Sequence, residues 1–174
     1  QYSAVHVSND FGATWAPLGE GLPGGVTNET LHFDPNDPSL FYLMTRRGLY
    51  RSRDEGGTWL RVLPASSNLV AGELAILPDS TLYSLQTETN RKFLLRSRDE
   101  GDSWVDLGTP FADNPARGFL AFAAASDALL VAGSGIVRST DGGVSWHESS
   151  SGILAATVRA LTLDRQNPER LLAL

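Results

Sequence analysis

The stretch SRDEGGTW, residues 52–59, returns three more times in this chain of 174 residues. The copies are SNDFGATW at 8–15, SRDEGDSW at 97–104 and STDGGVSW at 139–146. Their first serines are separated by 44, 45 and 42 residues. A regular period of this size indicates a repeat architecture that extends over the whole chain.

The segments between the octets predict strands. Each octet follows a short run rich in β-forming residues, such as AVHVS at 4–8 and GLYRS at 48–52. Two more such runs lie upstream around a turn, as in TLHFD, PNDPS and LFYLM, and no window carries a capped helical apolar stripe. Each repeat therefore predicts four strands, named A to D from the inside of a β-propeller outwards, with the octet at the C–D turn.

The repeat also predicts how the chain is divided. Residues 1–19 hold only strands C and D of a blade, and residues 151–174 hold only strands A and B. Complete blades are expected at about 20–63, 64–108 and 109–150. The last segment, LTLDRQNPERLLAL, can be laid on LHFDPNDPSLFYLM with Asp164 over Asp34 and Pro168 over Pro38. Three organisations follow: the two ends close one blade in a four-blade ring, the chain is an arc of a larger ring, or two chains form an eight-bladed ring.

Side-chain chemistry gives the octet pattern S-x-D-x-G-x-[ST]-W a structural role. Glycine permits positive φ in a tight turn, the aspartate and hydroxyls bond the turn's backbone, and one tryptophan per repeat predicts an anchor between blades worth ~3–5 kcal/mol. A calcium loop would need more oxygen ligands, so we expect no metal here. The structural residues are Ser8, Asp10, Gly12, Trp15, Ser52, Asp54, Gly56, Trp59, Ser97, Asp99, Gly101, Trp104, Ser139, Asp141, Gly143 and Trp146.

Composition narrows the function classes. A hydrophobic fraction of 41% with 20% charged residues is typical of a globular protein, and no run is long enough for a spanning helix. We therefore expect no membrane insertion. The net charge of -6 argues against nucleic acid, and zero cysteines exclude disulfides and thiolate sites. No cofactor is expected.

The octets resemble the Asp-box, or bacterial neuraminidase repeat. Together with the layout GLP…FDPNDP…LFYLMTRRGLYRSRDEGGTW, they make the chain similar to the Asp-box propellers: sialidases, xyloglucan-hydrolysing glycosidases, sortilin-type receptors and photosystem II assembly factors. The resemblance implies an all-β propeller of four-stranded antiparallel blades with Asp-box turns, and favours an extracytoplasmic or secreted location. Such rings usually have more than four blades, so we expect a propeller arc, or a homodimer that completes a larger ring, ahead of a closed four-blade monomer.

Ligands of propellers generally meet the face made by the D–A and B–C connections, opposite the box turns; we call it the loop face. A basic patch is predicted there, because Arg46-Arg47 and Arg91-Lys92 fall at equivalent connections, although ordinary solvated charges would give the same pattern. Arg51, Arg96 and Arg138 recur before the box serines, which favours a salt bridge or stem packing. The candidate ligand-binding residues are Arg46, Arg47, Glu73, Arg91, Lys92, Arg117 and Arg159.

The function predicted is a non-catalytic binding or assembly scaffold that engages a protein or glycan through the loop face. The alternative is a fragment or homologue of an Asp-box glycoside hydrolase, sialidase-like or xyloglucanase-like. The Arg-Ile-Pro element of sialidases is absent. Inverting glycosidases need two opposed carboxylates, and 20 acidic residues do not identify such a pair, so no catalytic residue is assigned.

Overall fold

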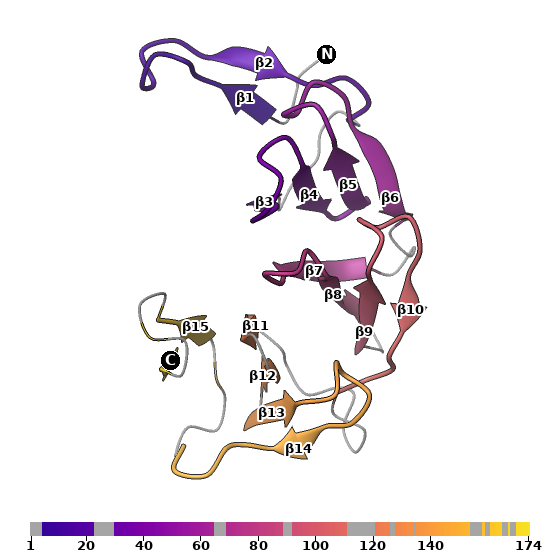
Figure 1. Cartoon of the computed structure of the whole chain (residues 1–174), viewed down its shortest axis with the longest axis vertical. Coiled ribbons are helices and arrows are strands. Elements are labelled where there is room, and N and C mark those ends of the chain that lie inside the picture. Colours follow the sequence, from indigo (N-terminus) through magenta and orange to yellow (C-terminus); the bar gives the residue numbers. More distant parts are fainter. Residues whose placement is uncertain are drawn as a thin grey trace. The chain divides into compact units, whose positions relative to one another are not determined.

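The computed structural model describes residues 5–22, 30–64, 69–88, 92–110, 121–125, 128–133, 135–153, 158, 161–164, 167 and 170–174. These residues form antiparallel strands and turns, which confirms the all-β fold class, and none of them forms a helix able to cross a membrane (Figure 1). The chain divides into two compact units, Gln1–Gly72 and Glu73–Leu174, each described here by itself.

The first unit contains a two-stranded and a four-stranded sheet. Strands β1 (Val5–Val7) and β2 (Ala16–Leu18) form the smaller sheet around the first octet. The larger sheet has the order β3-β4-β5-β6, and each strand is antiparallel to the one before it. Its strands are β3 (Thr30–Phe33), β4 (Phe41–Thr45), β5 (Gly48–Ser52) and β6 (Leu60–Pro64).

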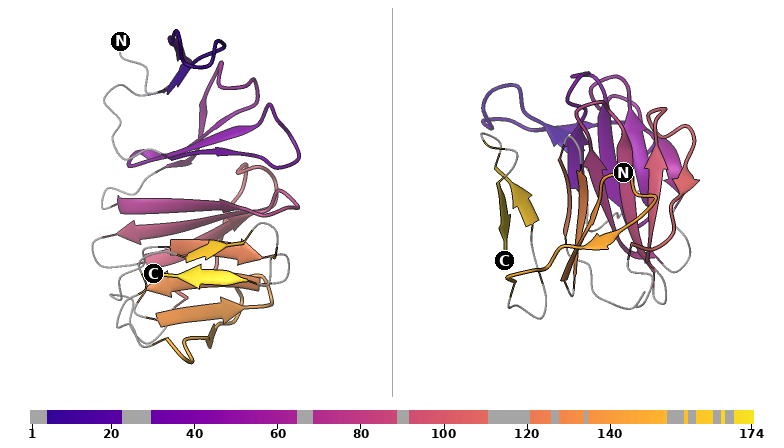
Figure 2. Two further views of the ribbon diagram at one scale, coloured as in Figure 1. Left: turned by 90° about the vertical axis from the view of Figure 1, so that its left-hand side faces the viewer. Right: turned by 60° about the horizontal axis from the view of Figure 1, so that its bottom comes forward.

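The second unit contains two four-stranded sheets and one two-stranded sheet. The first has β7 (Leu69–Ile76, which begins in the last residues of the first unit), β8 (Leu82–Glu88), β9 (Lys92–Ser97) and β10 (Val105–Asp106). The second has β11 (Ala121–Ala125), β12 (Ala128–Gly133), β13 (Gly135–Ser139) and β14 (His147–Glu148). Strands β15 (Leu161–Leu163) and β16 (Leu171–Ala173) form a hairpin, with β15 beside β11 (Figure 2).

The three four-stranded sheets share one register. Each places the first serine of its octet opposite an apolar residue of the second strand: Ser52 opposite Phe41, Ser97 opposite Leu82, and Ser139 opposite Leu129. These serines are only 1–2% exposed. The period of the sequence is therefore a period of strand pairing, and it positions each of these three octets at the same point of its sheet.

The hairpin β15–β16 reproduces β3–β4. Each residue pair of β15–β16 is a pair of β3–β4 shifted by 130 positions. Leu31–Leu43 corresponds to Leu161–Ala173, His32–Tyr42 to Thr162–Leu172, and Phe33–Phe41 to Leu163–Leu171. The turns also match. Asp34 N–H donates to the Leu40 carbonyl at 3.0 Å, and Asp164 N–H donates to the Arg170 carbonyl at 3.0 Å. Asp164 thus occupies the place of Asp34, while Pro168 lies outside the described residues.

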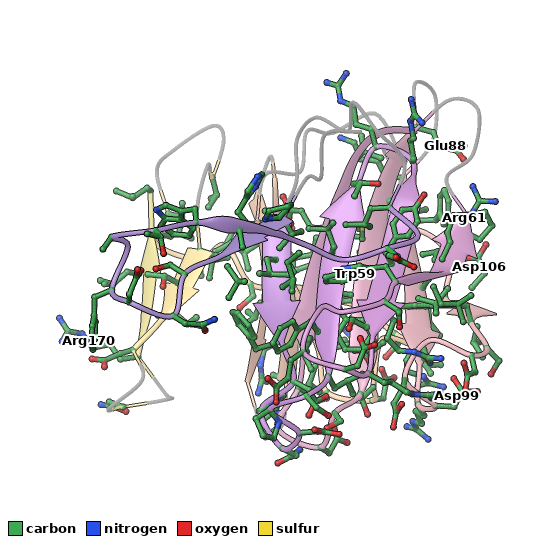
Figure 3. The ribbon with its side chains drawn as sticks, turned by 90° about the horizontal axis from the view of Figure 1, so that it is seen from above. Trp59, Arg61, Glu88, Asp99, Asp106 and Arg170 are labelled. Carbon is green, nitrogen blue, oxygen red and sulfur yellow. The ribbon has the colours of Figure 1, made fainter. Side chains whose placement is uncertain are left out.

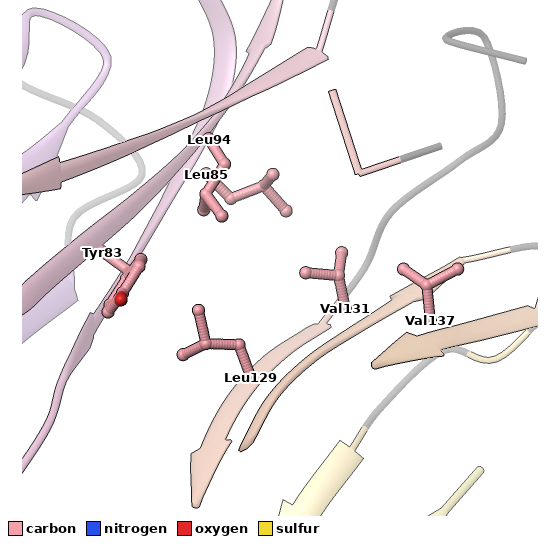
Figure 4. Close-up of a cluster of buried hydrophobic side chains, with 6 residues drawn as sticks. All are labelled: Tyr83, Leu85, Leu94, Leu129, Val131 and Val137. Atoms are coloured by element: carbon pink, nitrogen blue, oxygen red, sulfur yellow. The ribbon is translucent and has the colours of Figure 1, made fainter. Parts of the chain in front are cut away.

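Apolar side chains fill the space between successive sheets within each unit. In the second unit, Tyr83 and Leu85 lie two residues apart on β8 and so share a face, which packs against Leu129 and Val131 of β12 (Figure 4). In the first unit, Leu43, Tyr50 and Trp59 form a buried cluster against which Val5 and Leu22 pack. The core is thus made by sheets stacked face to face, as in propeller blades.

A recurring contact joins two of the octets to the sheet that precedes each of them. Leu18 lies against Gly56, where an added Cβ would come within 2.6 Å of the leucine side chain. Leu107 lies against Gly143 in the same way, at 2.8 Å. Both glycines therefore admit a leucine from the preceding outer strand. The same junction in the first unit has backbone bonds, because Glu20 N–H donates to the Gly57 carbonyl at 3.0 Å.

Candidate functional site

The octet turns are held by hydrogen bonds among their own residues. In the second octet the Ser52 hydroxyl donates to Asp54 Oδ1 at 2.7 Å and accepts from Gly56 N–H at 2.8 Å. Asp54 in turn accepts from the backbone N–H and the hydroxyl of Thr58, at 2.7 and 2.8 Å. The same four bonds recur in the octets that begin at Ser8, Ser97 and Ser139.

These bonds fix the octet aspartates as acceptors. The hydroxyl of Ser103, its backbone N–H and the hydroxyl of Ser97 lower the pKa of Asp99 from 3.8 to about 2. The hydroxyl of Thr14 is the largest cause of the same shift at Asp10, to about 2. A carboxyl group whose pKa lies this far below neutral pH does not donate a proton at pH 7. Among the described residues, no three metal-ligating side chains gather into a metal site.

Two consecutive residues of each octet have positive φ. The expected glycines, Gly12, Gly56, Gly101 and Gly143, have φ between 87° and 92°. The residue before each is also left-handed, with φ of 55° at Glu55, 57° at Glu100 and 56° at Phe11. Only the fourth octet places a glycine, Gly142, at that position. The octet pattern leaves this position variable, so the sequence gives no sign of its backbone constraint.

The octet tryptophans do not play one common role. Trp59 is 6% exposed within its cluster, whereas Trp15 is 65% exposed. Trp104 and Trp146 are half-buried, and each donates from Nε1 to the carbonyl of the octet glycine, at 3.0 and 3.1 Å. The prediction of a buried anchor in every repeat is therefore wrong for Trp15. Burial of a large ring depends on the neighbouring sheet, which the octet itself does not encode.

The loop face is built differently from the octet turns. Figure 3 shows Glu88, at the B–C connection of one sheet, and Asp99, in the octet of the same sheet, at opposite ends of the strands. In the first unit, the B–C turn is stabilised by Thr45, whose hydroxyl donates to the Gly48 carbonyl and accepts from Arg47 N–H, both at 2.9 Å. Arg46 and Arg47 are both exposed on this turn. Both arginines thus lie exposed on a turn that Thr45 holds with two hydrogen bonds.

In the second unit the described loop-face candidates are withdrawn from solvent. Lys92 begins β9 opposite Thr87, and its burial lowers the pKa of the ammonium group. Glu73 lies half-buried on β7, and this burial raises the pKa of its carboxyl. The candidates Arg91, Arg117 and Arg159 lie outside the described residues. A basic patch formed jointly by Arg46-Arg47 and Arg91-Lys92 therefore stays a prediction.

The recurring arginine before the octet has a partner that the sequence did not indicate. Arg96 donates from a guanidinium nitrogen to the Gly142 carbonyl at 3.2 Å, and the Tyr83 hydroxyl donates to the same oxygen at 3.2 Å. Both donors reach from one sheet to the octet of the next. Arg96 thus makes a hydrogen bond to octet backbone, where a salt bridge or stem packing was expected. The cross-strand pairing of Arg96 with Tyr83 explains why the two act together.

The sequence of this chain is similar to those of known proteins. The BNR/Asp-box repeat family matches residues 137–148. The chain is 31% identical over 151 residues to the xyloglucanase Xgh74A of Acetivibrio thermocellus, which covers 82% of this chain and 16% of that protein. It is 39% identical over 67 residues to a xyloglucanase of a Paenibacillus species, covering 34% of this chain and 6% of that protein. The chain spans only these fractions of the relatives it matches.

Solved structures agree on the fold. The GH74 xyloglucanase of Xanthomonas campestris superimposes with a TM-score of 0.74 at 18% identity, covering 97% of this chain and 32% of that one. YCF48 of Cyanidioschyzon merolae superimposes with a TM-score of 0.62 at 18% identity, covering 88% and 54%. At these identities the likeness shows the fold, an Asp-box β-propeller, and does not carry function across.

Proposed function

We propose that the blades of this chain, an Asp-box β-propeller homologous to GH74 xyloglucanases, contribute to a glycan-binding face. The observation that carries the proposal is the 31% identity to a xyloglucanase over 151 residues. Xyloglucan, a branched and uncharged β-glucan, is the corresponding ligand class. Such a ligand is recognised through its hydroxyl groups and sugar faces, without a net charge on the protein being required.

The polar groups of the octet turns are already hydrogen-bonded, whereas arginines of the loop face are exposed. This difference supports the loop face as the binding surface. The octet aspartates already accept bonds from their own turns, so they offer little to a sugar. Arg46 and Arg47 are exposed at the other end of the strands, on a turn whose shape is fixed by Thr45. Guanidinium groups present several N–H donors in a planar array, which suits neighbouring sugar hydroxyls.

Affinity electrophoresis in gels with and without xyloglucan tests the proposal. We expect the native chain to be retarded by the polysaccharide, and the Arg46→Ala/Arg47→Ala variant to bind about tenfold more weakly, a loss of about 1.4 kcal/mol. Arg53→Ala is the matched control, because it removes an exposed arginine from the octet end of the same sheet. An unretarded native chain, or equal losses in both variants, would contradict binding at the loop face.

A glycoside hydrolase is the second candidate, and one observation favours it. Burial raises the pKa of Glu73, which is the direction that a general acid needs in order to hold its proton near neutral pH. An inverting enzyme would also require a second carboxylate roughly 6.5–9.5 Å away. A chain that carried only part of such a site would still bind the polysaccharide.

Reducing-end release from xyloglucan separates the two candidates. Turnover by the native chain that is lost in Glu73→Gln, with gel retardation unchanged, would support hydrolysis. Retardation without turnover supports the non-catalytic scaffold. If neither gel retardation nor turnover is seen, the result favours the protein-binding scaffold expected from the sequence over a glycan-binding module.

A further inference from the structure

The indole of Trp59 lacks the hydrogen bond that two other octet tryptophans make. Trp104 and Trp146 each donate from Nε1 to the carbonyl of their octet glycine, at 3.0 and 3.1 Å. Trp59 is 6% exposed, and among the described residues its Nε1 has no hydrogen-bond partner. A buried donor without an acceptor is costly, which indicates that another contact holds the ring in this position.

Gly19 lies where the missing bond would form. A Cβ on Gly19 would overlap Trp59 Nε1 and would lie 2.8 Å from the Gly56 carbonyl oxygen, which is the kind of acceptor that the two bonded indoles use. Gly19 therefore packs against both the donor and the acceptor. The next residue completes the contact, because Glu20 N–H donates to the Gly57 carbonyl at 3.0 Å and the Glu20 carbonyl accepts from Trp59 N–H at 2.9 Å. We call these two backbone bonds the latch.

The second unit contains an equivalent junction, between β10 and the octet at 139–146. A shift of 89 positions turns the β1–β2 pair Val7–Ala16 into the β9–β10 pair Arg96–Val105. Three correspondences follow from this shift: Pro17 to Asp106, Gly19 to Gly108, and Glu20 to Thr109.

That junction has no latch. No backbone hydrogen bond joins residues 107–110 to the fourth octet, and the structure describes both segments. A Cβ on Gly108 would have open space, and the Trp146 indole makes its bond to the Gly143 carbonyl. The hydroxyl of Thr109 is buried and has no hydrogen-bond partner among the described residues. Each of the two junctions thus has one arrangement, either the latch or the indole bond.

Asp106 holds Gly108 on its own sheet. The Asp106 carboxylate accepts from Gly108 N–H at 2.7 Å, and the Gly108 carbonyl accepts from Leu94 N–H at 2.8 Å. Pro17 stands at the corresponding position of the first unit, and the side chain of proline carries no acceptor. Gly19 is therefore not held by a side chain two residues earlier, and it lies against the indole of the next sheet.

We infer that the junction between a sheet and the next octet has two mutually exclusive states, and that the residue two positions before the junction glycine selects between them. In the latched state the glycine packs on the octet, two backbone bonds cross the junction, and the indole is unbonded. In the free state the glycine stays on its own sheet and the indole bonds the octet glycine. Pro17 selects the latched state and Asp106 the free state. One side chain thus sets how firmly one sheet is held by the next, independently of any glycan.

Exchanging the selecting residue tests the inference. Pro17→Asp supplies a carboxylate that can hold Gly19 on its own sheet, so Trp59 Nε1 should then donate to the Gly56 carbonyl. Proton–nitrogen NMR gives one indole signal for each of the four tryptophans, and single Trp→Phe variants assign them. We expect the Trp59 indole signal to move downfield, towards the signals of the two indoles that are bonded in the native chain. Hydrogen exchange of the Trp59 backbone amide should become about fivefold faster, because its latch bond is lost.

Pro17→Ala is the matched control. It removes the proline ring without supplying an acceptor, so both Trp59 signals should stay as in the native chain. Asp106→Ala tests the opposite direction, because it releases Gly108 from its own sheet. The Trp146 indole signal should then move upfield, and the Trp146 backbone amide should exchange about fivefold more slowly. Asp106→Asn keeps an acceptor oxygen and should retain the native signals. Pro17 and Asp106 are both exposed, so these substitutions leave the core intact.

Three results would overturn the inference. A native Trp59 indole signal that already lies with those of Trp104 and Trp146 would show that its hydrogen bond is not missing. Unchanged signals in Pro17→Asp or in Asp106→Ala would show that the carboxylate does not select the state, as would equal changes in Pro17→Asp and Pro17→Ala. An indole signal that moves while the backbone amide of the same tryptophan keeps its exchange rate would show that the two arrangements are not exclusive.

Discussion

Gly19 lies against the indole ring of Trp59, so closely that a Cβ on Gly19 would overlap the ring nitrogen Nε1 and lie 2.8 Å from the Gly56 carbonyl oxygen. Gly19 has a φ of +98°, which also favours glycine. The residue that follows it, Glu20, accepts a hydrogen bond from Trp59 N–H at 2.9 Å. One glycine thus lets the β1–β2 hairpin close onto the tryptophan of the next sheet.

Gly19→Ala should therefore be strongly destabilising. A left-handed backbone costs about 1–2 kcal/mol for alanine, and overpacking adds about 1–3 kcal/mol. Gly108 is the matched control, because it occupies the equivalent place after β10, has a φ of +76° and has open space around its Cβ position. Gly108→Ala should lower the free energy of unfolding only by the cost of the left-handed backbone. Denaturant unfolding measures both, and equal losses would show that the contact with Trp59 is unimportant.

The four tryptophans should differ in their contribution to stability. Trp59→Ala is expected to reduce the free energy of unfolding by about 3–5 kcal/mol, because a buried ring leaves a cavity. Trp15→Ala should change it by less than about 1 kcal/mol in the monomeric chain, because that ring is 65% exposed. Urea titrations at low protein concentration make the comparison. A large loss at Trp15 would contradict its exposed placement.

The octet aspartates predict a loss of stability in acid. Asp99 has a pKa of about 2 in the folded chain against an ordinary value of 3.8. Its contribution is therefore fully present above about pH 4 and is lost as the pH falls from 3.8 towards 2. Ser103→Ala removes the largest cause, so the pKa of Asp99 should rise towards 3.8. Carbon-13 NMR titration of the carboxyl measures this, and an unchanged pKa would refute the role of the hydroxyl.

A glycine at the left-handed position before the octet glycine should be stabilising. Glu55 has a φ of 55°, a conformation that costs an L-residue about 1–2 kcal/mol and glycine almost nothing. Part of this gain is offset by the greater freedom of glycine in the unfolded chain, which leaves about 0.5–1 kcal/mol for Glu55→Gly. Arg53→Gly, two residues earlier on the same turn, should be destabilising. Thermal unfolding of both variants provides the check.

Local sequence patterns predicted the strand arrangement well. The octet contains the donors and acceptors of its own turn within a few residues, so the roles of Ser52 and Asp54 follow from the octet alone. Short runs of β-forming residues between turns predicted the strands, and the octet period predicted that the strands repeat along the chain. The match of Asp164 to Asp34 could be made because the turn hydrogen bonds depend on nearby residues only.

Contacts between sheets were the part that sequence could not supply. Trp59 is buried in a cluster against which Val5 of another repeat packs, whereas Trp15 is 65% exposed. Arg96 bonds the Gly142 carbonyl, a backbone group that carries no side-chain signal. Burial raises the pKa of Glu73 and lowers that of Lys92, which favours the neutral form of each. This burial comes from packing around two residues that the sequence named only as candidates for ligand binding.

The contact of Leu18 on Gly56, repeated by Leu107 on Gly143, bears on how such a chain grows by gene duplication. A newly copied repeat brings an octet turn that is already complete, together with two of the residues that join it to its neighbour. These are a leucine leaving one outer strand and a glycine receiving it. A duplicated blade can therefore be inserted without new matching mutations in the blades on either side, so the number of blades can change faster than the blade itself.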